Sequence, residues 1–505
     1  MLRFLKPSLR TSIFRNYCNQ TAFYDIPQRY RNAFYLANAP LFDYTNWFVH
    51  NAYTVCFPSL VKELLQTEKQ IGNVEAEKRI VEVINCLEPC ESLIDVNFPI
   101  KRSNGRREVV RGFRAMHNLQ LYNTPCLGGM RICSDLNKDH VRSFSILSTF
   151  KHACLGIEMS GAHGGLKISG IDYDTTELKD IVVSYGRELA KKGFLGSYVD
   201  VIEPDLYCSS KEMEWIAQEV AENAADGLAC AVGKPWSVGG IEIYDKCLAH
   251  GVLYALKLLL SEKKIMSEIE MDGGISGKTF IIQGLAGAIC VGVKEHDAFV
   301  YMEDGIPVKE LLDYKNGNDS IQEFNKYTRP GTMDEIYLEP CDILIFAATH
   351  RSLQCYVAEN VQAKIVVEAA YAPITPTAHK VLLARKRVVL PDIFAGCGAS
   401  VTSYLEYVRN LQQKNLEYVR NLQQVPDNML ISRLANLSLT GAHIDFINVN
   451  DEAKIKNVLE SMMKKSYEQI LSIMEEYKLG LDIRTAAYIN AIRKIFNKII
   501  HAKKY

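Results

Sequence analysis

A strand-like run that leads into a glycine turn is the first segment whose residue types suggest a chemistry. Residues 278–283, KTFIIQ, are followed by Gly284, and a dinucleotide-binding site begins with such a strand and glycine turn. It also needs a helix whose N-terminus faces the pyrophosphate. Here only residues 284–287 precede a second apolar run at 288–293. Parallel neighbours need a crossover of roughly a dozen or more residues, so we expect the two runs to pair antiparallel or to form one interrupted element, without that helix.

Other glycines and the cysteines carry weaker signals. Glycine-rich stretches at 127–131 and 161–165 are predicted to be loops, each beside a helical or strand-like run. Of the 14 cysteines, Cys86 and Cys90 form one close pair. No second pair follows, whereas zinc sites of this kind combine two pairs. We therefore predict no metal site, and instead free buried thiols in a reducing compartment.

Length and composition are those of a globular protein with two or three domains. The chain has 505 residues, of which 48% are hydrophobic and 23% charged. Its net charge is -1, which gives no electrostatic reason to expect nucleic acid or an anionic membrane as a partner. No apolar run approaches the roughly 20 residues that span a bilayer.

The first 20 residues differ from the rest in charge. They contain serine and threonine among apolar residues, and no acidic residue precedes Asp25. Their basic residues are Arg3, Lys6, Arg10 and Arg15. This composition is typical of a mitochondrial transit peptide, so we expect a protein of the mitochondrial matrix, although a disordered basic tail has the same pattern.

The rest of the chain alternates helical and strand-like segments, which favours an α/β fold with a mostly parallel, doubly wound sheet. The predicted helices lie at 60–86, 177–193, 207–223, 248–262 and 454–500, the last broken at Gly480. The predicted strands lie at 278–283, 289–293, 343–347, 364–367 and 387–390.

Two local patterns add detail. Asn104-Gly105 separates two alternating runs within residues 94–117, which predicts a β-hairpin. LEYVRNLQQ occurs at 405–413 and again at 416–424. An 11-residue period returns to nearly the same helix face, so the repeat lengthens one amphipathic helix, or is a tandem duplication without functional consequence.

Five segments together resemble hexameric glutamate dehydrogenases of the animal mitochondrial type, from about Cys86 to Asn497. They are TPCLGGMR at 124–131, RELAKKGFLG at 187–196, VGKPWSVGGI at 232–241, DILIFAA at 342–348 and LGLDIRTAAYINAI at 479–492. The resemblance implies a substrate domain, a Rossmann-type domain and a C-terminal helix that returns to the first domain. It also implies hexamers and oxidation of glutamate to 2-oxoglutarate with NAD or NADP.

The resemblance implies the following division of the chain. We expect a transit peptide at 1–20, a substrate and oligomerisation domain at 50–243, a Rossmann-like domain without its first crossover helix at 244–404, a reduced antenna-like region at 405–453 and C-terminal helices at 454–505.

A glutamate pocket needs two cations for two carboxylates, since charge-assisted hydrogen bonds are the strong ones. By resemblance, Lys151 binds the α-carboxylate, and Ser403 contacts the side-chain carboxylate. The second cation is missing, because Leu127 stands where the family has a lysine, beside the retained Gly128 and Gly129. Relatives that act on leucine or phenylalanine also carry leucine there, so the change implies an apolar substrate or an unused site.

The catalytic positions are also altered. The resemblance assigns Asp205 to proton transfer, and places His163 where the family has its catalytic lysine. Histidine exchanges protons near neutral pH but supplies no charge when neutral. Glu203 replaces a small family residue, and we expect it to raise the pKa of Asp205 if both carboxylates face the cleft.

The cofactor side departs further from the family. The resemblance assigns Gly284 to the nucleotide turn and Glu295 to the adenosine ribose. Leu248 stands within a segment where the family has arginine and threonine. Tyr371 and Gly396 replace asparagines of the nicotinamide pocket.

Two interpretations follow. The protein is a dehydrogenase of impaired activity, or one retuned to apolar amino acids, with Lys151, Asp205 and His163 in the reaction. Alternatively, it is a non-catalytic subunit of a homo-hexamer, or of a mixed hexamer with a paralogue, that binds a small amino acid or oxo acid.

Overall fold

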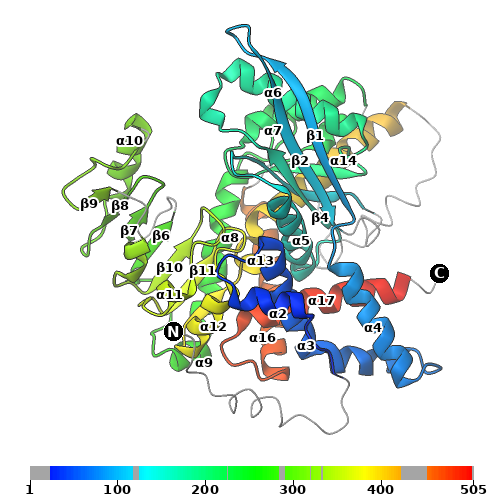
Figure 1. Ribbon diagram of the computed structural model, residues 1–505, viewed down its shortest axis with the longest axis vertical. Coiled ribbons are helices and arrows are strands. Elements are labelled where there is room, and N and C mark those ends of the chain that lie inside the picture. Colours follow the sequence, from blue (N-terminus) through cyan, green and yellow to red (C-terminus); the bar gives the residue numbers. More distant parts are fainter. Residues whose placement is uncertain are drawn as a thin grey trace.

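The chain folds around two β-sheets, with helices between and below them (Figure 1). The computed structural model describes residues 23–117, 124–224, 226–283, 290–318, 320–330, 334–421 and 452–502. The predicted transit peptide and most of the predicted antenna-like region lie outside these residues. The α/β fold class is confirmed, because one sheet is mixed and the other is mainly parallel.

The first sheet has the strand order β1-β2-β4-β3-β5. Its strands are β1 (Ser92–Lys101), β2 (Arg107–His117), β3 (Cys126–Ile132), β4 (Ser160–Leu166) and β5 (Asp200–Pro204). The predicted hairpin is confirmed, since β1 and β2 pair antiparallel from Ser92↔Met116 to Lys101↔Arg107, and Gly105 has φ +83° in the turn. β3 lies between β4 and β5 and is parallel to both.

The two glycine-rich stretches predicted to be loops are strands β3 and β4, so that prediction was wrong. Their glycines permit close packing rather than a turn. A Cβ at Gly128 would lie 1.7 Å from the Ala162 carbonyl oxygen, and one at Gly161 would lie 2.2 Å from that of Ser145. The missing side chains let β3 pack against β4, and β4 against the helix that contains Ser145.

The second sheet has the order β12-β11-β10-β6-β7-β8-β9. Its strands are β6 (Phe280–Gln283), β7 (Cys290–Lys294), β8 (Ala298–Tyr301), β9 (Thr328–Pro330), β10 (Ile343–Phe346), β11 (Ile365–Glu368) and β12 (Val388–Leu390). The five predicted strands of this region are confirmed, and the pairing of β6 with β10, β10 with β11 and β11 with β12 is parallel.

One prediction about this sheet was wrong. β6 and β7 pair parallel, neither antiparallel nor as one interrupted element. The register shifts between Phe280 and Ile281, where the partners move from Cys290 to Gly292. Residues 284–289, which join the two strands, lie outside the described residues.

Helices surround both sheets. The N-terminal and first-sheet helices are α2 (Gln28–Tyr35), α3 (Leu41–Thr67), α4 (Asn73–Leu87), α5 (Lys138–Leu155), α6 (Thr175–Lys191) and α7 (Ser210–Ala221). Those that follow are α8 (Tyr244–Leu260), α9 (Lys263–Glu268), α10 (Val308–Asn318), α11 (Cys355–Ala358), α12 (Pro376–Ala384), α13 (Asp392–Ala395), α14 (Cys397–Asn421), α16 (Glu452–Glu476) and α17 (Ile483–Ala502).

Most predicted helices are confirmed. The single helix expected at 60–86 is two, because α3 ends at Thr67 and α4 begins at Asn73. The C-terminal break is at Gly480, whose φ of +60° suits a residue without a Cβ. The described residues contain no helix that is long and apolar enough to cross a membrane.

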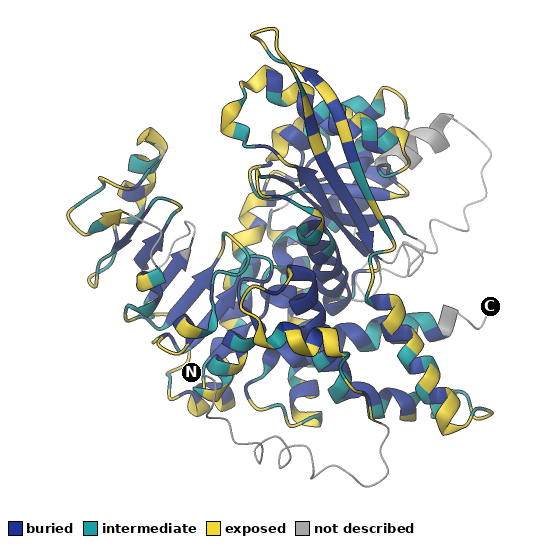
Figure 2. Ribbon diagram, in the orientation of Figure 1, coloured by how far each residue is buried: buried dark blue, intermediate teal, exposed yellow. Residues whose placement is uncertain are grey.

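Helix α5 forms the centre of the molecule (Figure 2). The Asn137 side chain caps its N-terminus by accepting a hydrogen bond from the His140 backbone, and Gly156, with φ +83°, ends it. From Phe144 to Leu155 every side chain is buried. α5 packs against β4 and β2 on one side and against α17 and α3 on the other, so it carries its residues into the space between the two sheets.

Candidate functional site

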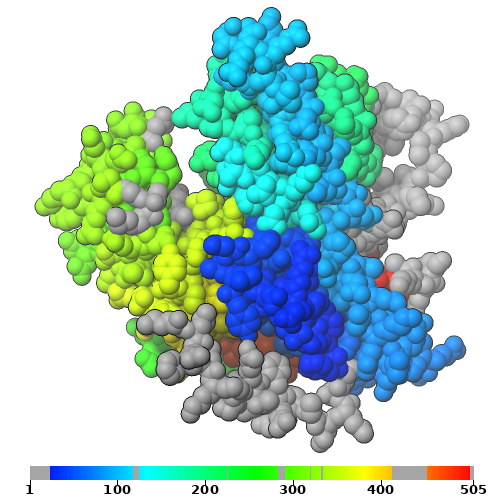
Figure 3. Space-filling model, in the orientation of Figure 1, coloured from blue at the N-terminus to red at the C-terminus, as the bar shows by residue number. Residues whose placement is uncertain are grey.

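A cavity of about 780 Å³ lies between the two halves of the molecule. In Figure 3 the outline of the molecule is notched between the second sheet and the first. The polar end of the cavity is lined by Arg131, Lys151, Glu203, Asp205 and Tyr371. The opposite end is apolar and is lined by Leu253, Phe280, Ile282, Ile343 and Ile345. The cavity therefore joins a charged site to an apolar wall made by α8, β6 and β10.

Lys151 is held at the polar end by α5. Only 8% of this residue is exposed, and its ammonium nitrogen lies 4.2 Å from the centre of the Tyr371 ring. Burial alone would lower the pKa of Lys151, but Tyr371 and the nearby Glu203 outweigh it, so the pKa is raised above its usual value. The side chain is thus a fixed positive charge on the cavity wall, as an anion-binding residue must be.

Asp205 follows β5 and is held by two neighbours. Its Oδ2 accepts hydrogen bonds from Nη2 of Arg131 at 2.9 Å and from Nε2 of His163 at 2.8 Å. Burial raises the pKa of Asp205, but Arg131 and His163 lower it by more, so the carboxylate stays ionised. Glu203 is expected to raise this pKa, but the pKa of Asp205 is lowered; the repulsion between the two carboxylates acts instead on Glu203, whose pKa Asp205 helps to raise.

His163 lies behind Asp205 and is fully buried. Its ring packs between Phe144 and Tyr371, with ring centres 4.8 and 5.6 Å away. Burial lowers the pKa of His163 to about 4, although Asp205 opposes the shift, so the ring is neutral at neutral pH. Its Nδ1 makes no hydrogen bond to any described residue. His163 is absent from the cavity lining, and it contacts two residues that do line the cavity, Asp205 and Tyr371.

The Ser403 hydroxyl is hydrogen-bonded to the carboxylate of Glu203. The Ser403 hydroxyl donates a hydrogen bond to the Glu203 carboxylate at 2.7 Å, and the Tyr244 hydroxyl lies 2.8 Å from Ser403. Burial raises the pKa of Glu203, while Ser403 and Lys151 oppose the increase. The serine assigned to a substrate carboxylate is thus already bonded to a carboxylate of the chain itself.

The remaining predicted substrate residues lie on β3. Leu127 is completely buried and packs in the main hydrophobic core rather than on the cavity wall. Gly128 and Gly129 lie at the centre of the strand, and their carbonyl oxygens accept hydrogen bonds from the buried Arg114 at 3.1 and 2.8 Å. A Cβ at Gly129 would lie 2.8 Å from Nε2 of His163, so this glycine gives the histidine its space.

Only some of the residues predicted to bind the cofactor line the cavity. Gly284 lies outside the described residues. Glu295 follows β7 and forms an ion pair with Lys315 of α10 at 2.7 Å, and it is absent from the cavity lining. Leu248, Tyr371 and Gly396 do line the cavity. Of the residues that the resemblance assigns to the cofactor, Glu295 is therefore already paired, and the Tyr371 ring lines the polar end of the cavity.

Two further residues belong to the site. Arg131 forms the ion pair with Asp205, and Tyr244 completes the chain of hydrogen bonds to Glu203. The sequence shows both in recognisable segments, but neither spacing nor composition indicates which carboxylate each one contacts. That depends on the packing of β3 beside β5 and of α8 beside α14.

Two α/β halves that face a cavity with a lysine, an arginine and an aspartate define a two-domain protein of the amino-acid dehydrogenase plan. Residues 90–222 match the Glu/Leu/Phe/Val dehydrogenase dimerisation domain, and residues 239–438 match the Glutamate/Leucine/Phenylalanine/Valine dehydrogenase domain. The chain is 31% identical over 435 residues to the mitochondrial glutamate dehydrogenase of Dictyostelium discoideum, covering 82% of this chain and 86% of that one. It therefore belongs to the Glu/Leu/Phe/Val dehydrogenase family.

Proteins of lower sequence identity also resemble this chain. The glutamate dehydrogenase of Thermotoga maritima is 28% identical over 437 residues, which cover 85% of this chain and 94% of that one. Among solved structures, a hetero-hexameric glutamate dehydrogenase from Thermus thermophilus in a leucine-bound form superposes with a TM-score of 0.66 at 22% identity, covering 83% of this chain and 91% of that one. Glutamate dehydrogenase 2 of Plasmodium falciparum superposes with a TM-score of 0.66 at 18% identity, covering 95% and 99%. These two structures support the shared fold.

Proposed function

We propose that this protein is a mitochondrial glutamate dehydrogenase-family subunit whose dehydrogenase activity is impaired or lost, and that it serves as a structural or regulatory subunit of a hexamer. The observation that carries the proposal is the pairing of Asp205 with His163 and Arg131. The carboxylate assigned to proton transfer is ionised and engaged by two neighbours, one of which replaces the catalytic lysine.

The family reaction needs a positive charge beside the reacting carbon and a group that activates water. A neutral, buried His163 supplies no positive charge, and it does not line the cavity. Loss of a positioned acid or base reduces the rate by about 10²–10⁴-fold. This substitution alone therefore predicts a weak enzyme even with substrate bound.

Two further changes should weaken the binding of glutamate. Glu203 places a carboxylate on Ser403, and Leu127 removes a lysine. The pocket has thus lost one positive charge and gained one negative charge relative to the family pattern. A second substrate carboxylate would meet Glu203, whereas a single carboxylate still has Lys151.

Cofactor binding is doubtful for a geometric reason. The connection between β6 and β7 has only the six residues 284–289, which cannot contain both a glycine turn and a helix of about a dozen residues. Glu295 is engaged by Lys315. NAD or NADP would therefore lack the helix dipole and the ribose contact that normally hold it.

A binding experiment tests this proposal. Thermal melts of the purified chain are recorded with millimolar NADH and NADPH, beside the Dictyostelium discoideum enzyme as a positive control. We expect no stabilisation of this chain. A concentration-dependent increase in its Tm with either dinucleotide would contradict the loss of cofactor binding.

A second function is a dehydrogenase retuned to apolar amino acids. It is favoured by the apolar wall of the cavity, which includes Leu253, Phe280 and Ile345. Leucine with either cofactor is therefore assayed beside glutamate. Reduced nicotinamide formed from leucine but not from glutamate would select this alternative.

The assembly proposal rests on the family. One relative in fold is a hetero-hexamer, and the dimerisation domain matches here over residues 90–222. A subunit that retains this domain and loses catalysis can still occupy a place in a mixed hexamer with an active paralogue.

A further inference from the structure

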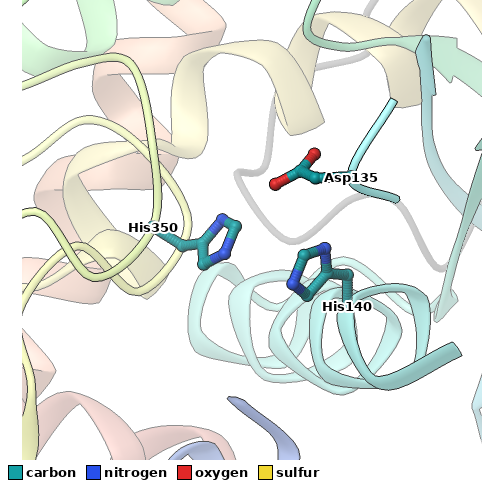
Figure 4. Close-up of side chains that lie close together, drawn as sticks. All are labelled: Asp135, His140 and His350. Carbon is teal, nitrogen blue, oxygen red and sulfur yellow. The ribbon is translucent and has the colours of Figure 1, made fainter. Parts of the chain in front are cut away.

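Three potential metal ligands meet where the two halves of the molecule come together (Figure 4). Asp135 lies in the segment between β3 and α5, His140 lies in the first turn of α5, and His350 lies between β10 and α11. One ligand atom from each lies within 4.8 Å of the others. Two of the ligands therefore come from the first half of the molecule and the third comes from the second half.

One imidazole nitrogen of the cluster has no partner among the described residues. Nδ1 of His350 is buried and makes no hydrogen bond to any residue that the structure describes. A buried nitrogen of this kind, next to a second imidazole and a carboxylate, is a suitable metal ligand.

Neighbouring groups contact the three side chains. Nδ2 of Asn137 donates a hydrogen bond to Nε2 of His140 at 3.2 Å, at the N-terminus of α5, and a metal at this nitrogen would displace that bond. The rings of His140 and His350 contact each other edge to face, with their centres 4.5 Å apart. The Cys133 thiol donates a hydrogen bond to Oδ1 of Asp135 at 2.7 Å. The three side chains are therefore close together before a metal arrives.

We propose that Asp135, His140 and His350 bind one divalent transition-metal ion, of which Zn²⁺ is the best match, and that the ion links the two halves of the molecule. Two imidazoles and one carboxylate are typical zinc ligands and leave the fourth position to water. Zinc lies about 2.0–2.2 Å from such ligands, which places the ligand atoms about 3.3 Å apart. The set therefore contracts on binding, and we expect the exposed Asp135 side chain to move inward and give up its hydrogen bond from Cys133.

The surrounding charges set the strength of the site. Arg131 and Arg351 both act on His350, and their positive charges oppose a bound cation. Arg131 is balanced by its ion pair with Asp205 at 2.9 Å, and Asp135 supplies one negative charge to the ion. We therefore expect reversible binding rather than a permanent structural metal. Because Arg131 also lines the cavity, the ion would lie close to the polar end of the cavity.

The ligands cannot be recognised from their spacing. His350 is far from His140 in the sequence, and the cysteine pattern that marks many zinc sites is absent. The site arises only because the loop after β10 packs against the start of α5. It is independent of whether any dehydrogenase activity is retained.

Calorimetry with ZnCl₂ tests the proposal on the full chain after removal of metals with a chelator. We expect binding of about one Zn²⁺ per chain and an increase in Tm. His350→Ala and Asp135→Asn should each weaken binding at least tenfold and abolish the increase in Tm. His296→Ala is the matched control, because this exposed histidine lies in the same half of the molecule and should leave binding unchanged.

Two further measurements make the result decisive. Melts without metal establish that each variant is folded, and Co²⁺ absorption reports whether the ligands are nitrogen and oxygen or include thiolate. The proposal is overturned if the wild-type chain binds no zinc, or if His350→Ala and Asp135→Asn bind it as the wild type does. It is also overturned if binding is lost instead in Cys86→Ser or Cys90→Ser.

Discussion

At the scale of single residues, most charged groups at the polar end of the cavity are paired with other residues of the chain. Asp205 is paired with Arg131 and His163, and Glu203 is bonded to Ser403. Lys151 makes a cation–π contact with Tyr371. In an enzyme such groups are matched to the charge that develops on the substrate. Here most of them are matched to one another.

Removal of the Glu203 carboxylate should open the pocket to dicarboxylates. Glu203→Ala frees the Ser403 hydroxyl and removes a negative charge near Lys151, so we expect glutarate to bind at least tenfold more tightly, which corresponds to about 1.4 kcal/mol. Calorimetry of the variant and the wild type measures this. Glu222→Ala, at an exposed position, is the control. Equal affinities in all three proteins would show that Glu203 does not block the site.

The His163 ring should make stability depend on pH. Its folded pKa of about 4 lies below the usual 6.5, so the unfolded chain binds a proton between these values and the folded chain does not. The stabilisation is complete above pH 6.5 and is lost as the pH falls towards 4, by about 3 kcal/mol for this group. Urea unfolding between pH 7 and 4 measures the loss, which should be smaller in His163→Asn. The same pH dependence in both proteins would contradict a buried neutral ring.

At the scale of elements, close packing of glycine strands positions the site. β3 can lie beside β4 and β5 only because Gly128 and Gly129 have no side chains. That packing places Arg131, His163 and Asp205 together. The glycines are therefore part of the architecture of the site, whatever the site now does.

A methyl group at Gly128 should damage the fold. Its Cβ would lie 1.7 Å from a backbone oxygen, which no rotamer change relieves, so we expect Gly128→Ala to destabilise the protein by about 3 kcal/mol or more. Gly317→Ala is the matched control, because nothing lies within 4 Å of its Cβ and the site is helical. Thermal unfolding compares them. A Gly128→Ala variant as stable as the wild type would refute this account of β3.

Much of this architecture is predictable from the sequence. The Asn104-Gly105 turn specifies the hairpin, and the apolar runs specify the strands of the second sheet. The glycines of β3 and β4 mislead because a missing side chain serves a turn and a close strand contact equally well. The parallel pairing of β6 and β7 depends on both strands fitting beside β10, which local spacing does not reveal.

The sequence indicates which residues to consider for the candidate site, but not which residues they contact. Lys151 and Asp205, which are assigned by resemblance, both line the cavity, and His163 contacts Asp205. The bond from Ser403 to Glu203 needs α14 to pack beside α8 and β5, and contact of His140 with His350 needs the two halves to meet. These contacts join residues far apart in the chain, so no local pattern encodes them.

At the scale of the whole molecule, the fold is that of its family while the cleft has diverged. The described core runs continuously through α3, α5, α14, α16 and α17, and the dimerisation domain is matched in sequence. Of the altered positions, Glu203, Leu248, Tyr371 and Gly396 line the cavity, whereas Leu127 and His163 do not. Relaxed selection on catalysis, with selection for the fold maintained, is the explanation that the proposed function implies.

Assembly should survive the loss of catalysis. We expect the chain to form a hexamer, alone or with an active paralogue, because the matched dimerisation domain is retained over residues 90–222. Size-exclusion chromatography with light scattering measures the mass of each sample. A 57.0 kDa monomer both alone and in the mixture would contradict a role as a hexamer subunit.

The central claim is that the cleft no longer supports efficient hydride transfer. The direct measurement is the formation of reduced nicotinamide by the purified chain with glutamate or leucine and either NAD or NADP, beside the Dictyostelium discoideum enzyme. We predict a rate at least about 10²-fold below that enzyme with every combination. A rate comparable with that of the active relative, for either amino acid, would contradict the account.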